Sequence, residues 1–157
     1  IPTLAEVLRR FRHKVLLNVE LTNYNDPLDA LPERVLEVVQ EGGGLDDLLF
    51  SSFNPIALKT ICQLYMEART ALLLAPKVPR IINRWLEWFT PHQDIHPHFR
   101  LVTTSFIRRV RRSNRRINTW TINEYKNMVD LFNIGVSGII TDDVEMALRA
   151  RKEVFSL

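Results

Sequence analysis

One carboxylate interrupts an otherwise apolar run and has the character of a functional group. Glu20 is the penultimate residue of the run at residues 15–21, which predicts a strand, and it shares a face of that strand with Asn18. A buried carboxylate is costly unless it pairs with a cation or binds a metal ion. Hard divalent ions such as Ca²⁺ and Mg²⁺ prefer oxygen ligands. This pattern alone leaves two interpretations open for Glu20: a metal ligand, or the partner of a neighbouring Lys or Arg.

Two further groups of reactive side chains carry weaker signals. Cys62 is the only cysteine, which excludes an internal disulfide and a cysteine-rich zinc site. It follows Ile61 in an apolar helical pattern, so we predict a buried, inert thiol. A run of six arginines in the helix predicted at residues 106–116 lacks the interleaved aromatic residues of nucleic-acid platforms, which favours a solvated face over a binding patch. These residues are Arg108, Arg109, Arg111, Arg112, Arg115 and Arg116.

The composition is that of an ordinary globular protein. The chain has 157 residues, of which 46% are apolar and 25% are charged, and we expect a single domain over residues 1–157. Its net charge of +3 would assist contact with an anionic substrate but does not indicate nucleic acid. No apolar run reaches about 18 residues, so no transmembrane segment is predicted, and a cytoplasmic location is favoured. Because the sequence begins with Ile1, we expect further residues upstream.

Short apolar runs alternate with helical patterns, which is typical of repeated βα units. Six such units fit either an open doubly wound sheet or a (β/α)8 barrel, and neither a GxGxxG nor a P-loop motif is present. The predicted strands are residues 15–21, 47–53, 70–74, a short strand within 94–103, 117–122 and 138–141, and the predicted helices are 4–11, 31–40, 55–66, 81–86, 106–116, 125–132 and 144–154.

Three local patterns make these predictions more specific. Thr3 and Glu6 have the spacing of a capping box at the start of the first helix. The strand at 15–21 lacks clean alternation, so we expect it to be buried on both faces. Asn123 is predicted to cap a helix that begins at Glu124.

Five stretches, in order along the chain, decide between the two architectures. Residues 117–123 read INTWTIN and residues 135–142 read GVSGIITD. Residues 17–21 read LNVEL, residues 50–55 read FSSFNP, and residues 1–8 read IPTLAEVL. Together they resemble the glycerophosphodiester phosphodiesterase family, whose strands carry WTVN, GVDGIITD, LNIELK and SSFNP.

The resemblance implies a TIM-type (β/α)8 barrel of which this chain holds about six units, the third to the eighth. It implies a metal-dependent phosphoric diester hydrolase that splits glycerophosphodiesters into an alcohol and glycerol 3-phosphate. In that setting Glu20 is a ligand of a divalent metal, Ca or Mg. Trp120, and with it Phe53, are expected to form apolar walls of the substrate pocket. The substrate is a small molecule, and no nucleic-acid partner is implied.

Several groups of the family pattern are absent from this sequence. The HRG motif and the ExD metal pair do not occur, so no catalytic residue is assigned in this chain, and we expect it to be inactive alone. Thr22 stands where the family often has a lysine. We interpret His96 as structural, and we place His13 at the end of the barrel opposite the chemistry.

Two alternatives stay open. The chain could be a non-catalytic barrel relative, or a partial barrel that acts as a binding or assembly module and forms homo-oligomers through its open edges. It could also belong to a different phosphodiesterase on the same barrel, such as one that acts on sphingomyelin.

Overall fold

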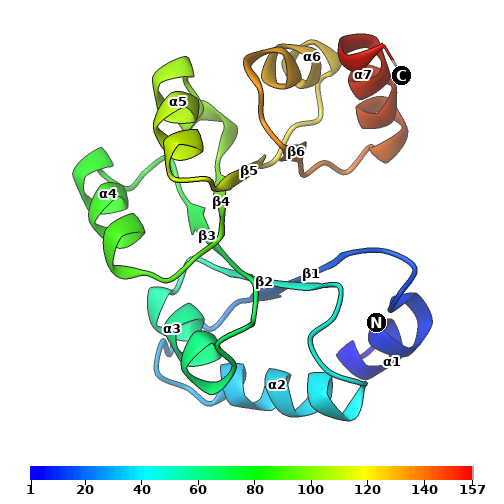
Figure 1. The fold of residues 1–157 in the computed structure, drawn as a ribbon, viewed down its shortest axis with the longest axis vertical. Helices are drawn as coiled ribbons and strands as arrows, with labels where there is room; N and C mark the ends of the chain where they lie inside the picture. Colours follow the sequence, from blue (N-terminus) through cyan, green and yellow to red (C-terminus); the bar gives the residue numbers. More distant parts are fainter. Residues whose placement is uncertain (157) are drawn as a thin grey trace. The chain divides into compact units, whose positions relative to one another are not determined.

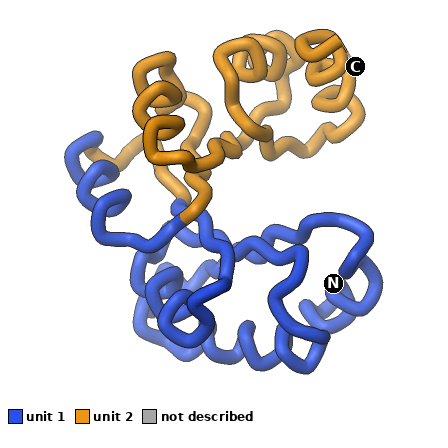
Figure 2. The backbone as a smooth tube through the Cα atoms, viewed as in Figure 1, with its two compact units in different colours: residues 1–72, 80–92 blue, residues 73–79, 93–157 orange. Residues whose placement is uncertain are grey.

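The structure, a computed structural model, describes residues 1–156; Leu157, the last residue of the expected domain, lies outside the described residues. Helices and strands alternate along the chain (Figure 1), as the sequence predicts for an α/β protein. The chain forms two compact units (Figure 2), of which unit 1 comprises Ile1–Leu72 and Arg80–His92, and unit 2 comprises Leu73–Pro79 and Gln93–Leu157. A single domain over residues 1–157 stays a prediction. Within residues 1–156, no helix has the length and apolar character needed to cross a bilayer.

Unit 1 contains parallel strands that pair in chain order. The first strand pairs with the second in a register that sets Glu20 opposite Ser51, and the second pairs with the third. The elements of unit 1 are α1 (Leu4–Phe11), β1 (Leu17–Leu21), α2 (Leu31–Glu41), β2 (Leu48–Ser52), α3 (Pro55–Leu64), the start of β3 (Thr70–Leu74) and α4 (Arg80–Phe89).

The strands of unit 1 differ in how they are buried. Every residue of β2 and β3 is buried, including the polar Ser51, Ser52 and Thr70, because both faces of a parallel sheet are covered. β1 is different: Leu21 is buried, whereas Asn18 and Glu20 are exposed. The prediction that this strand is buried on both faces is therefore wrong. Leu17 and Val19 pack against the hydrophobic core, and the opposite face carries the two polar side chains.

Local signals in the sequence set the ends of the unit 1 helices. Thr3 is the N-cap of α1 and forms the predicted capping box with Glu6. Asn54 caps α3, and Pro55 is its first residue. Proline suits this position because it lacks the backbone N–H, which has no partner within the helix there. α2 ends at Glu41, one residue beyond the predicted helix at 31–40, with Gly42 as its C-cap.

We expect Thr3→Ala to lower the free energy of unfolding by about 1 kcal/mol at neutral pH, because the hydroxyl caps the first turn. The backbone N–H and then the hydroxyl of Thr3 hold the pKa of Glu6 below its ordinary value of 4.5. A carboxyl group whose pKa is lower in the folded state stabilises the fold when the pH is above the pKa of the unfolded state. This contribution is lost as the pH falls through the pKa of the folded state. Urea unfolding at about pH 7 and about pH 3 should thus show a smaller effect in acid, with Thr3→Ser close to wild type; an undiminished effect in acid would contradict this explanation.

Unit 2 has its own parallel strands, which also pair in chain order. The pairs Ile95↔Ile117 and Thr119↔Ile139 set the register, and His98 forms an isolated parallel bridge with Trp120. The elements of unit 2 are the end of β3, β4 (Asp94–Pro97), the 3-10 helix η1 (Phe99–Leu101), α5 (Thr104–Arg112), β5 (Arg116–Thr119), α6 (Tyr125–Ile134), β6 (Gly138–Ile139) and α7 (Val144–Phe155).

The predicted boundaries in unit 2 are less accurate than those in unit 1. The helix predicted to run to Arg116 ends at Arg112, because Asn114 adopts a positive φ of 53°, which a continuing helix does not allow. Arg116 instead begins β5, and the strand ends at Thr119 rather than at residue 122.

Candidate functional site

Glu20 lies near the carboxyl end of β1 with its side chain exposed. The Tyr24 hydroxyl donates a hydrogen bond of 2.9 Å to Oε1 of Glu20. On the same face of β1, the Asn18 amide donates to Oγ of Ser51 at 3.0 Å, which joins β1 to β2. The partner of Glu20 is thus a neutral phenol rather than the Lys or Arg that the second interpretation requires.

Tyr24 also joins Glu20 to Phe53, the predicted pocket wall of unit 1. The rings of Tyr24 and Phe53 meet edge to face with centroids 5.6 Å apart, and Phe53 is half-buried directly after β2. Burial, and then the hydrogen bond and charge of Glu20, raise the pKa of Tyr24 above its ordinary value of 10.0. The phenol therefore stays protonated, and stays a hydrogen-bond donor, throughout the neutral pH range.

The chemistry of Glu20 fits a ligand of a divalent cation. A carboxylate offers about four lone-pair sites, and Tyr24 occupies one of them. One carboxylate cannot fill the coordination shell of Ca²⁺ or Mg²⁺, which takes six or more oxygens. Within residues 1–156, no three His, Cys, Asp or Glu side chains gather closely enough to hold a metal ion together. Glu20 is thus suited to contribute one ligand to a site that needs others.

Trp120, the second predicted pocket wall, lies directly after β5 in unit 2. Its indole N–H donates to the carbonyl oxygen of His96 at 2.7 Å, and its ring meets the His98 ring edge to face at 4.9 Å. The backbone N–H of Phe99 donates to the Trp120 carbonyl at 2.8 Å. These contacts fix the orientation of the half-buried indole at the carboxyl ends of β4 and β5.

The two histidines of this region have different surroundings. His96 is buried, and its Nε2 accepts a 3.1 Å hydrogen bond from the Asn118 amide, which agrees with a structural role. His98 is half-buried, and its Nδ1 accepts from the backbone N–H of Arg100 at 3.2 Å. Burial, and then the positive charge of Arg100, lower the pKa of His98 below its ordinary value of 6.5. His98 is therefore predominantly neutral at pH 7, with its ring proton on Nε2.

The structure thus groups the functional candidates within each unit. Glu20 and Phe53 come together through Tyr24 in unit 1, and Trp120 lies with His96 and His98 in unit 2.

Asn123 does not cap a helix, contrary to prediction. The N-cap of α6 is Glu124, whose side chain makes no capping hydrogen bond. The Asn123 amide donates to Oδ2 of Asp142 at 2.7 Å, and its oxygen accepts from the Thr141 hydroxyl and from the Asp142 N–H. Asn123 therefore ties the end of one βα connection to the next. The helix-cap rule failed because these partners are distant in the sequence.

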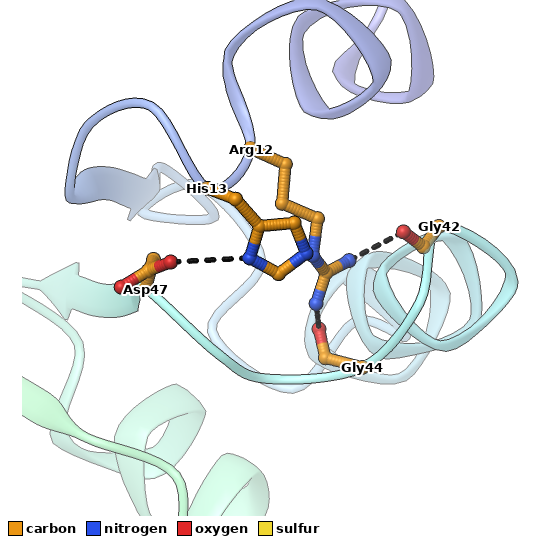
Figure 3. A network of polar contacts seen from close by, with 5 residues as sticks. All are labelled: Arg12, His13, Gly42, Gly44 and Asp47. Carbon is orange, nitrogen blue, oxygen red and sulfur yellow. Dashed lines mark hydrogen bonds and ion pairs between the residues drawn. The ribbon is translucent and has the colours of Figure 1, made fainter.

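A polar network marks the amino ends of β1 and β2 (Figure 3). Arg12 donates from both guanidinium Nη atoms to the carbonyls of Gly42 and Gly44, and His13 Nδ1 lies 3.3 Å from the Asp47 carboxylate. Gly44 has a positive φ of 101°, which explains the glycine there. The network joins the connection before β1 to the connection before β2, so it agrees with the placing of His13 away from the chemistry.

The remaining sequence candidates have unremarkable surroundings. Cys62 is half-buried rather than fully buried; burial raises the pKa of its thiol, and its sulfur lies 3.7 Å from the Thr70 hydroxyl. Of the arginines near α5, four are exposed, as a solvated face requires: Arg108, Arg111, Arg112 and Arg116.

Curated relatives are similar to this chain along most of its length. A glycerophosphodiester phosphodiesterase of Bacillus altitudinis is 27% identical over 98% of this chain. Another, from Caldanaerobacter subterraneus subsp. tengcongensis, is 23% identical over 92% of this chain. The aligned part of this chain spans 64% and 59% of the lengths of these two relatives, respectively.

A solved structure shares the fold. A phosphodiesterase of Oleispira antarctica, in complex with the product sn-glycerol-3-phosphate, superimposes with a TM-score of 0.83 at 24% identity. The match covers 96% of this chain and 61% of the other. This similarity confirms the expected fold class, a partial TIM-type barrel of six βα units. Residues 1–146 match the Glycerophosphoryl diester phosphodiesterase family, and the chain belongs to this family.

Proposed function

We propose that this chain is the C-terminal part of a metal-dependent hydrolase that splits glycerophosphodiesters into an alcohol and glycerol 3-phosphate. The observation that carries the proposal is the exposed Glu20 carboxylate near the carboxyl end of β1, oriented by Tyr24, in a chain of this family. TIM-type barrels place their active sites at the carboxyl ends of the strands. We propose that both units, over residues 1–157, belong to one barrel.

In the proposed reaction, a water oxygen forms a bond to phosphorus, the bond from phosphorus to the alcohol oxygen breaks, and a proton passes to the leaving oxygen. A bound divalent cation, Ca or Mg, would supply charge neutralisation on the phosphoryl oxygens. Glu20 would hold that cation, and Tyr24 fixes the orientation of the carboxylate. Trp120 and Phe53 provide apolar walls for the glycerol portion of the substrate. The histidines that move the proton are not assigned in this chain, so the chain alone is expected to be inactive.

The test compares this chain with a completed barrel, in which the part of a family member that holds its first two strands and the helix between them precedes Ile1, since α1 already supplies the helix before the third strand. We expect the completed barrel to hydrolyse glycerophosphocholine in the presence of Ca²⁺ or Mg²⁺, and the 157-residue chain not to do so. Circular dichroism and a cooperative melt establish that both proteins are folded. A folded completed barrel without turnover would refute the proposed reaction, and turnover by the chain alone would refute its inactivity.

We expect Tyr24→Phe in the completed barrel to weaken cation affinity about tenfold, because groups that orient a metal ligand contribute 10–100-fold. The phenylalanine keeps the ring contact with Phe53 and removes the hydroxyl, and with it the hydrogen bonds to Glu20 and to the backbone of Phe53. Tyr125→Phe is the matched control, since Tyr125 donates to Glu153 on the surface. The measurement is activity against cation concentration; an unchanged half-saturating concentration would show that Tyr24 does not position Glu20.

A second candidate function, assembly with other chains, is favoured by one observation. In the strand order, β1 and β6 stand at the two ends, and terminal strands offer backbone groups for pairing. Sedimentation equilibrium of the chain tests this proposal. A discrete oligomer would support assembly, and a stable monomer at all concentrations would exclude homo-oligomerisation through these strands.

A further inference from the structure

Helix α4 presents large apolar side chains to solvent. Ile81, Trp85 and Trp88 are 77%, 63% and 79% exposed, and Ile82 and Phe89 are also exposed. These five residues are called the α4 apolar face. The Phe89 ring contacts both indoles, with centroid distances of 4.2 Å to Trp85 and 4.8 Å to Trp88. The face is therefore a continuous aromatic cluster and not a set of scattered exposed residues.

The polarity of α4 is reversed relative to an ordinary surface helix. Its buried residues are Asn83 and Glu87, both polar, whereas its exposed side carries the apolar face. An amphipathic helix in a soluble domain normally directs its apolar stripe toward the core. The exposed side of α4 therefore has the composition of a surface that is covered by something apolar.

The charges on α4 indicate what covers it. Arg80 and Arg84 are exposed, and the only acidic residue of the helix, Glu87, is buried. The exposed side thus combines aromatic rings with positive charge and carries no carboxylate. Indole and phenyl groups at the headgroup level, with flanking Lys or Arg, are typical of helices that lie in the interface of an anionic membrane.

We propose that α4 docks the protein onto an anionic phospholipid surface through the α4 apolar face. A second copy of the chain fits this face less well. In a twofold-symmetric interface the same patch meets itself, which would gather four arginines, Arg80 and Arg84 of each copy, with no exposed carboxylate of α4 to balance them. Anionic lipid headgroups complement these two charges, and the interior of the headgroup region accommodates the rings. Docking is measured without substrate, so it does not rest on the proposed hydrolase activity.

The test uses the full chain with two kinds of vesicle: phosphatidylcholine alone, and phosphatidylcholine with about one third phosphatidylglycerol. We expect sedimentation with the anionic vesicles and a blue shift of tryptophan emission, both weakened by salt. Arg80→Gln with Arg84→Gln should lower partitioning onto anionic vesicles roughly 30-fold, as each cation near such a surface contributes about fivefold. Trp85→Ser with Trp88→Ser should lower it by a similar factor of about 30.

The matched control replaces two exposed arginines of α5, Arg108→Gln with Arg112→Gln, which should leave partitioning unchanged. Melting temperatures verify that each variant is folded. If the double tryptophan variant does not fold, the double arginine variant decides the outcome. Absence of vesicle binding, or an equal loss in the α5 control, would overturn the proposal. A dimer in solution that the tryptophan variant dissociates would also overturn it, because a second copy would then cover the face.

Discussion

Glu20→Gln in the completed barrel should reduce cation-dependent hydrolysis at least about 100-fold, because even groups that only orient a metal ligand contribute 10–100-fold. Glutamine keeps the size of the side chain and an oxygen that can accept from Tyr24, and it removes the negative charge. Glu20 is exposed, so the substitution creates no cavity and should leave the melting temperature unchanged. The loss therefore reports on the cation and not on the fold.

The cation dependence separates a ligand from a residue that acts in another way. If Glu20 holds the cation, the variant needs a higher concentration of Ca²⁺ or Mg²⁺, and excess cation restores part of the activity. Glu41→Gln, at the exposed end of α2, is the matched control and should behave as wild type. Lower activity with an unchanged cation titration would show that Glu20 acts on the substrate instead.

The elements that local chemistry determines were predictable from the sequence. The Thr3 hydroxyl accepts from the Glu6 N–H in α1, and the Asn54 side chain accepts from the Ile56 N–H in α3. These partners lie within a few residues of each other in the sequence. The strands at residues 48–52 and 70–74 each hold three consecutive large apolar residues, and both strands are fully buried. The family motifs were needed to choose the barrel over a doubly wound sheet, because strands and helices alternate in the same way in both architectures.

The elements that long-range contacts determine were not predictable in this way. Asn123 bonds to residues in the next connection rather than to the helix that follows it. Asn114 ends α5 early by adopting a positive φ, which asparagine tolerates but does not require. The exposure of Asn18 on β1 depends on which face of that strand packs against the core, and an apolar run without alternation does not reveal that face.

The candidate site shows the same division. Glu20 was identifiable because a carboxylate in an apolar strand needs an explanation, and Trp120 because it lies in a family motif. Tyr24 was missed, although it lies four residues after Glu20 and just beyond the strand. The signal is weak, since the conformation of the intervening loop decides whether the hydroxyl turns back to the carboxylate.

Trp120→Ala in the completed barrel should raise KM for glycerophosphocholine roughly 30-fold with a smaller change in kcat. If about half of the indole packs on the glycerol portion, it removes about 80 Å² from water, which stabilises the complex by about 2 kcal/mol. Such a contact is the same in the ground state and the transition state, so its loss appears in KM. Trp120→Phe keeps an aromatic wall and loses the hydrogen bond to His96, so it should retain most of the affinity.

A substrate without glycerol distinguishes a pocket wall from a structural support. Trp120→Ala also removes the ring contact with His98, so a general loss of structure at the ends of β4 and β5 would impair every substrate. Bis(p-nitrophenyl) phosphate has a scissile phosphodiester but no glycerol to pack on the indole. If Trp120 is a wall for glycerol, the increase in KM is confined to glycerophosphocholine. An equal loss on both substrates would instead assign Trp120 the structural role of holding His96 and His98.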